Sequence, residues 1–145
     1  MRSPTRTPLP VSEYTPGTGL LDTSVLASEN DVPILPAEAS ISMLSLAELT
    51  AGPHATIDLV ERGRRQERLQ VIEAFYDALP FDTECARAYG RVYAEAIQAG
   101  RKARGRRAVD LMIAATAVAH GLPLYTLNAA DLRGLEAVLE VVDCG

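Results

Sequence analysis

The stretch DLMIAATAVAHGLPLYTLN, residues 110–128, carries the pattern that decides the fold. Residues 109–120 (VDLMIAATAVAH) are apolar on almost every side, which is typical of a helix buried inside a domain. Gly121 ends this helix, and LPLYTL (122–127) then predicts a short buried strand. A buried helix that leads directly into a buried strand is characteristic of α/β proteins.

The rest of the chain supports the same class. Three further short apolar runs predict strands, namely GLL (19–21), ISML (41–44) and EVVD (140–143). Residues 45–79 have a helical pattern that breaks at Gly52-Pro53, so we expect a helical hairpin there. Asp82 is a suitable N-cap for a helix that ends near Ala99. Because strands alternate with helices, the sequence predicts one α/β domain with a central, mostly parallel sheet of short strands flanked by helices.

Length and composition limit the possible classes. The chain has 145 residues and a net charge of -5, and residues 19–145 are expected to form one domain. Residues 1–18 contain four prolines and are expected to be a disordered leader. No apolar run reaches the roughly 18 residues needed to cross a bilayer. With only two cysteines, the chain carries no disulfide framework, which favours the cytoplasm as its compartment.

Four carboxylates are expected at one edge of this sheet. Asp22 directly follows the first strand, and Asp131 follows the 122–127 strand by a few residues. Glu48 lies near the start of the helix after the second strand, and Asp110 near the start of the buried helix. In open α/β sheets, ligands bind outside the carboxyl ends of the strands, where these helices also begin. The sequence therefore predicts a candidate site made of Asp22, Glu48, Asp110 and Asp131.

Each of these acids also has an ordinary structural interpretation. Asp22 could cap the helix that follows it. Ser45 and Glu48 have the spacing of a capping box, as do Asn128 and Asp131 with an asparagine cap. Asp110 could complement a helix dipole. The sequence alone leaves these alternatives open for each residue taken singly.

The four acids together favour a metal site. Asp110 is the one charge within the apolar helix, and a buried charge is rarely kept without a partner. Clustered carboxylates repel one another, and a divalent cation removes this repulsion. Ligands that are all oxygen indicate a hard ion, Mg²⁺ or Mn²⁺. Four polar residues could orient the carboxylates or bound water as a second layer, namely Thr23, Ser24, Thr126 and Asn128.

The motifs resemble a known family. The strings LLDTSVLA (20–27), ISMLSLAELTAG (41–52), DLMIAATAVAHGLPLYTLN (110–128) and AADL (129–132) look like the PIN domain of VapC-type toxins. That resemblance implies a metal-dependent ribonuclease that binds Mg²⁺ or Mn²⁺ and cleaves single-stranded or looped RNA. It also implies a cognate antitoxin and a homodimer. By position, Asp22, Glu48 and Asp110 would be the core ligands, and Asp131 would complete the site.

The chain departs from the family pattern at two positions. Leu127 stands where many relatives have Arg or Lys, and Leu132 stands where they have an aromatic residue. Neither change removes a carboxylate, although the first weakens the expected contact with phosphate.

Two segments concentrate the positive charge of the chain. One contains Arg62, Arg64, Arg65 and Arg68, and the other, RKARGRR (101–107), runs directly into Asp110. Such runs are often only solvated surface. Beside an acidic site, however, arginines can hold the phosphates that flank the scissile bond. We therefore expect RNA contacts from the second segment, through Arg101, Lys102, Arg104, Arg106 and Arg107.

Two other functions compete with the nuclease. A non-catalytic α/β metal-binding or signalling module, such as one resembling a receiver domain, needs a lysine at the end of a late strand. The only lysine, Lys102, lies in the basic segment instead. A PIN domain that serves only as a platform for a partner is the second alternative, and four intact carboxylates argue against it.

Overall fold

The computed structural model describes residues 17–145. Five strands form one sheet in the order β3-β2-β1-β4-β5, and every neighbouring pair is parallel. The strands are β1 (Thr18–Leu21), β2 (Glu38–Ser42), β3 (Asp77–Leu79), β4 (Leu124–Thr126) and β5 (Val141–Asp143). The predicted α/β class is confirmed, and the described sheet is wholly parallel rather than mostly so.

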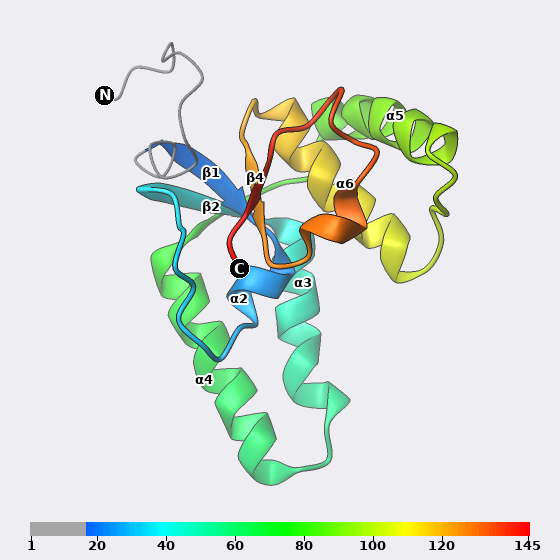
Figure 1. The fold of residues 1–145 in the computed structure, drawn as a ribbon. Helices are drawn as coiled ribbons and strands as arrows, with labels where there is room; N and C mark the ends of the chain where they lie inside the picture. The colour runs from blue at the N-terminus through cyan, green and yellow to red at the C-terminus, as the bar shows by residue number, and fades with distance from the viewer. Residues whose placement is uncertain (1–16) are drawn as a thin grey trace.

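The helices cover both faces of the sheet. They are α2 (Thr23–Leu26), α3 (Met43–Ala51), α4 (Leu59–Phe75), α5 (Thr83–Gln98) and α6 (Arg106–Ala119), with 3-10 turns η1 (Gly52–Ala55) and η2 (Ala129–Leu132). Figure 1 shows α5 and α6 packed side by side, while α3 and α4 form a hairpin that extends away from the sheet. The predicted hairpin is therefore present, with η1 at its tip.

Neighbouring residues of the central strands face opposite cores. Leu20 and Leu124 belong to the core under α5 and α6. Leu21 and Tyr125 belong to the other core, with residues of α2 and α4. Gly19 allows Tyr125 to pack closely, because a Cβ at Gly19 would lie 2.4 Å from the tyrosine ring. Burial on both faces explains why β1 and β4 are read as continuous apolar runs.

Several predicted boundaries are wrong. The second strand ends at Ser42, whose side chain caps α3 by accepting from the backbone N–H of Leu44 at 3.0 Å. Residues 77–79 form the edge strand β3 rather than helix, since three residues are too few to show a strand period. The buried helix α6 begins at Arg106, three residues before the predicted start.

The predicted leader, residues 1–18, lies outside the described residues except for Gly17 and Thr18, and Thr18 is the first residue of β1. Within residues 17–145, no helix is long and apolar enough to cross a membrane.

Candidate functional site

A cleft of about 200 Å³ opens at the carboxyl ends of β1 and β4. β2 and β3 lie on one side of β1, and β4 and β5, which come later in the chain, lie on its other side. The β1/β4 boundary is thus the point where the strand order reverses, which is the usual ligand position in such sheets. All four predicted carboxylates line this cleft: Asp22, Glu48, Asp110 and Asp131.

Asp22 is held from both of its carboxylate oxygens. Oδ1 accepts from the backbone N–H of Ser24 at 2.8 Å and also from the Ser24 hydroxyl. Oδ2 accepts from the hydroxyl of Thr126 at 2.6 Å. The capping interpretation is therefore correct for Asp22, but it describes only one oxygen, because the other is bound from the neighbouring strand.

Thr126 and Ser24 connect the two strand ends. The hydroxyl of Thr126 is fully buried and accepts from the backbone N–H of Asn128 at 2.9 Å. The hydroxyl of Ser24 accepts from the backbone N–H of Leu127 at 3.0 Å. Each hydroxyl thus donates to Asp22 and accepts from the chain after β4, so the orientation of Asp22 is fixed by two elements.

Glu48 reaches the cleft from the second turn of α3. Its Oε1 accepts from the hydroxyl of Thr23 at 2.6 Å, and the same hydroxyl lies 2.9 Å from that of Ser45. The alternative interpretation of Ser45 and Glu48 as a capping box is wrong, because Ser42 caps this helix. Sequence reasoning did not assign Ser45 to the site. The sequence feature that could have placed Ser45 at the site is its spacing of three residues from Glu48, which puts both side chains on one helix face.

Asp110 is a carboxylate of the cleft whose pKa is raised. It is half-buried in the second turn of α6, one turn later than expected, because the helix begins at Arg106. The pKa of Asp110 is raised to about 6, first by burial and then by the charges of Glu48 and Asp22, against the opposing effect of Arg107 and Arg106. The three acids therefore interact electrostatically across the cleft.

Asp131 lies on the outer rim. It belongs to η2 and its side chain is exposed. Its backbone carbonyl accepts from Arg107 Nη1 at 2.8 Å and from Arg101 Nη2 at 3.0 Å. Asn128 also lines the cleft, but its side chain does not cap η2, so the alternative interpretation as an asparagine cap is wrong.

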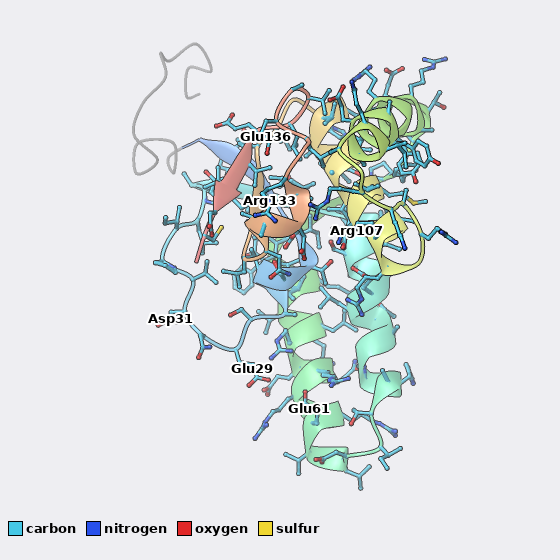
Figure 2. The ribbon with its side chains drawn as sticks, turned by 45° about the vertical axis from the view of Figure 1, so that its right-hand side comes forward. Glu29, Asp31, Glu61, Arg107, Arg133 and Glu136 are labelled. Atoms are coloured by element: carbon cyan, nitrogen blue, oxygen red, sulfur yellow. The ribbon has the colours of Figure 1, made fainter. Side chains whose placement is uncertain are left out.

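The basic residues before Asp110 divide into groups. Arg106 lines the cleft itself. Lys102 and Arg104 are exposed, whereas Arg101 and Arg107 donate to the carbonyls of η2. Figure 2 shows Arg107 next to the segment from which Arg133 projects. Of the predicted RNA-binding residues, Arg106 is the one that the structure places at the cleft wall.

The donor set of the cleft suits a hard divalent cation. The converging ligand groups are carboxylates, and hydroxyl groups surround them. Within residues 17–145, no three His, Cys, Asp or Glu side chains already stand together as a metal cage. Burial and the nearby charges of Glu48 and Asp22 raise the pKa of Asp110, so the ionised forms of these carboxylates disfavour one another. A bound cation would stabilise the ionised forms of all three acids.

Comparison with known proteins agrees with the resemblance to the PIN domain that the sequence motifs indicated. The family model of the PIN domain matches residues 20–134. The chain belongs to the PIN-domain family.

Two curated relatives and one solved structure are similar to this PIN domain along most of its length. Ribonuclease VapC5 of Mycobacterium tuberculosis is 36% identical over 136 residues, which cover 88% of this chain and 94% of the relative. Ribonuclease VapC of Rickettsia bellii is 31% identical over 100 residues, covering 66% and 69%. The crystal structure of VapBC-5, a member of the VapBC family of toxin-antitoxin systems from Mycobacterium tuberculosis, superposes with a TM-score of 0.73 at 29% identity, covering 88% of this chain and 98% of that one.

Proposed function

We propose that this PIN domain is a ribonuclease that hydrolyses RNA phosphodiester bonds with Mg²⁺ or Mn²⁺ and acts as the toxin of a toxin–antitoxin pair. The observation that carries the proposal is the electrostatic coupling of Asp110 to Glu48 and Asp22 in a cleft at the β1/β4 boundary. The two relatives named as ribonucleases support the substrate class.

The residues of the chain have separate tasks in this proposal. Asp22, Glu48 and Asp110 would hold the cation, and Asp131 would complete its coordination through water. A cation held there supplies the Lewis acidity that activates water and the scissile phosphate. Thr126 and Ser24 fix the direction of the Asp22 carboxylate, and Thr23 fixes that of Glu48.

Substrate binding falls to the cleft wall. Arg106 stands beside the acids and is free to meet a phosphate next to the scissile one. With a net charge of -5, the protein has little general attraction for nucleic acid. Selection of RNA would therefore depend on an exposed loop that fits the cleft.

The proposal includes partners. A cognate antitoxin would bind this chain and block the cleft, and the activity would take place in the cytoplasm. The similarity to VapBC-5, a member of a family of toxin-antitoxin systems, supports such a partner. The hairpin of α3 and α4 offers it an apolar surface, with Ile57, Leu59 and Val60 exposed near its tip. The proposed toxin is also a homodimer, as the family resemblance implies.

The test compares carboxylate variants on structured RNAs with and without Mg²⁺ or Mn²⁺. Asp22→Asn and Asp110→Asn should each lower cleavage by about 100-fold or more while the protein stays folded, because each removes a ligand charge. Asp31→Asn, at an exposed aspartate far from the cleft, is the matched control (Figure 2). Parent-like cleavage by both cleft variants would overturn the site, and a parent that cuts no RNA while binding its partner would favour a platform.

Glu48→Gln separates catalysis from helix stability. Since Ser42 caps α3, we expect loss of cleavage with little change in melting temperature. A lower melting temperature with full activity would instead assign Glu48 a structural role.

A further inference from the structure

Two arginines from different elements meet at one backbone carbonyl. Arg107, in the first turn of α6, donates through Nη1 to the carbonyl of Asp131 at 2.8 Å. Arg101, just beyond the end of α5, donates through Nη2 to the same carbonyl at 3.0 Å and approaches that of Ala130 at 3.4 Å. We call Arg101 and Arg107 the arginine pair. It connects the α5–α6 region to η2, the turn that carries Asp131.

The backbone at Arg101 is itself fixed. Gly100 has a φ of +77° and its N–H donates to the carbonyl of Ile97 at 2.9 Å. The N–H of Arg101 donates to the carbonyl of Ala96, also at 2.9 Å. These two bonds are the Schellman arrangement that closes a helix. Arg101 therefore extends toward η2 from a defined position and not from a loose loop.

The chain after η2 also packs against the end of α5. A Cβ at Gly134 would lie 2.5 Å from the Cβ of Ala99, and the φ of Gly134 is +100°. Only glycine allows this approach without a shift of the backbone. The η2 segment is thus held at two places, by the arginine pair at Asp131 and by close packing at Gly134.

We propose that the arginine pair positions Asp131 at the rim of the cleft and does not serve primarily to bind RNA. Asp131 stands on a single 3-10 turn that has no side-chain cap, and its own side chain is exposed. Such a turn relies on outside contacts to keep one orientation. The proposal rests on the proposed metal-dependent function, because it assigns Asp131 a place in the coordination of the cation.

Cation affinity distinguishes this role from a simple charge effect. Arginines near a cleft repel a divalent cation, so removing them should strengthen Mn²⁺ binding if charge alone mattered. Loss of positioning has the opposite sign, because a displaced carboxylate binds the cation less well. Residues that orient metal ligands typically change affinity by about 10–100-fold when they are replaced.

The experiment titrates Mn²⁺ alone into the full-length, metal-free chain. The double variant Arg101→Gln, Arg107→Gln should bind Mn²⁺ about tenfold more weakly than the parent. It should also lose amide protection in residues 129–135, and kcat should fall with KM for RNA nearly unchanged. Arg133→Gln removes a nearby exposed charge whose side chain makes no hydrogen bond to η2 among the described residues, and it should behave like the parent. Arg107→Lys keeps a donor and should recover part of the affinity.

A second comparison tests whether the arginine pair affects Mn²⁺ binding through Asp131. In an Asp131→Asn background, adding the two glutamines should lower Mn²⁺ affinity no further. Mn²⁺ binding equal to or tighter than that of the parent, with a raised KM, would overturn the proposal and return the pair to RNA binding. A parent that binds Mn²⁺ but cleaves no RNA would overturn the ribonuclease proposal alone, since the affinity measurements would still decide the role of the pair.

Discussion

Two arginine-rich segments look alike in the sequence and differ in the structure. On α4, Arg65 Nε lies 2.9 Å from Glu61 Oε2, and hydrogen bonding to Arg65 holds the pKa of Glu61 below its ordinary value. Beside the 101–107 segment the pKa of Asp110 is instead raised to about 6. No basic side chain of residues 101–107 forms an ion pair with an acid in the described part of the chain, whereas three arginines of α4 do.

The difference lies in how each group of charges is neutralised. Three of the α4 arginines are matched by nearby acids. Arg65 also binds a backbone carbonyl beside η1, that of Gly52. Arg62, which has no acidic partner within residues 17–145, donates to the carbonyl of Pro53. These contacts complete the hairpin. In the cleft, by contrast, carboxylates face one another and the arginines act on them only at a distance. Clustered acids beside Arg106, which forms no ion pair among the described residues, are consistent with the proposed binding of a cation and a phosphate.

The largest expected contrast comes from one arginine of each segment. Arg106→Ala should lower kcat/KM for RNA by roughly tenfold, the effect of losing one charged phosphate contact. The slope of log(kcat/KM) against log salt should become shallower by about 0.7, because one fewer counterion is released. Arg64→Ala, whose side chain is 62% exposed and 3.5 Å from Glu61, should change neither quantity. Equal effects of the two variants would remove the distinction between the segments.

A smaller effect is expected in the stability of the hairpin. Arg65→Ala removes the hydrogen bond to the carbonyl of Gly52, so the free energy of unfolding should fall by about 1 kcal/mol. The partly exposed ion pair with Glu61, which is lost as well, adds little to stability. Urea denaturation measures this change. Cleavage per folded molecule should stay at the parent level, and a loss of cleavage without destabilisation would place Arg65 in substrate binding.

The smallest effect concerns Asp110 in the metal-free protein. Its pKa is about 6 in the folded state against an ordinary value of 3.8, so the folded state binds more protons between about pH 4 and pH 6. Stability from this group is therefore lost as pH rises through that window. Since the side chain is half-exposed, solvent screening reduces the expected loss to about 1 kcal/mol.

Asp110→Asn should remove this loss. Chemical denaturation without metal should find the variant more stable than the parent at pH 7.5 and equal to it near pH 4. Adding Mn²⁺ should stabilise the parent selectively. A stability difference that does not vary with pH would contradict the assigned coupling.

The sequence predicted those parts of the site that depend on local rules. Asp22 and Asp131 could be placed because each follows a strand that is recognisable as a short apolar run. The helix start at Met43 could not, because Ser42 and Ser45 are both plausible caps and only the paired strand shows where β2 ends. The edge strand β3 was missed because it is three residues long and adjoins a helix.

Contacts between distant segments were also beyond the sequence. Nothing local indicates that Arg101 and Arg107 meet a carbonyl 30 and 24 residues later, so the sequence predicted RNA contacts for them together with Arg106. The hydroxyl of Thr126 was expected near the site, but its bond to Asp22 depends on the two strands being neighbours. Assignments of this kind need the strand order, which residue periodicity does not contain.

That last hydrogen bond has a consequence for how the protein is made. Asp22 and Thr126 are 104 residues apart, so a ribosome adding about 5–20 residues per second needs roughly 5–20 s to supply the second after the first. During this interval the nascent chain holds Asp22 and Glu48 without the strand that completes the cleft. The cleft is therefore incomplete during synthesis until β4 has joined the sheet.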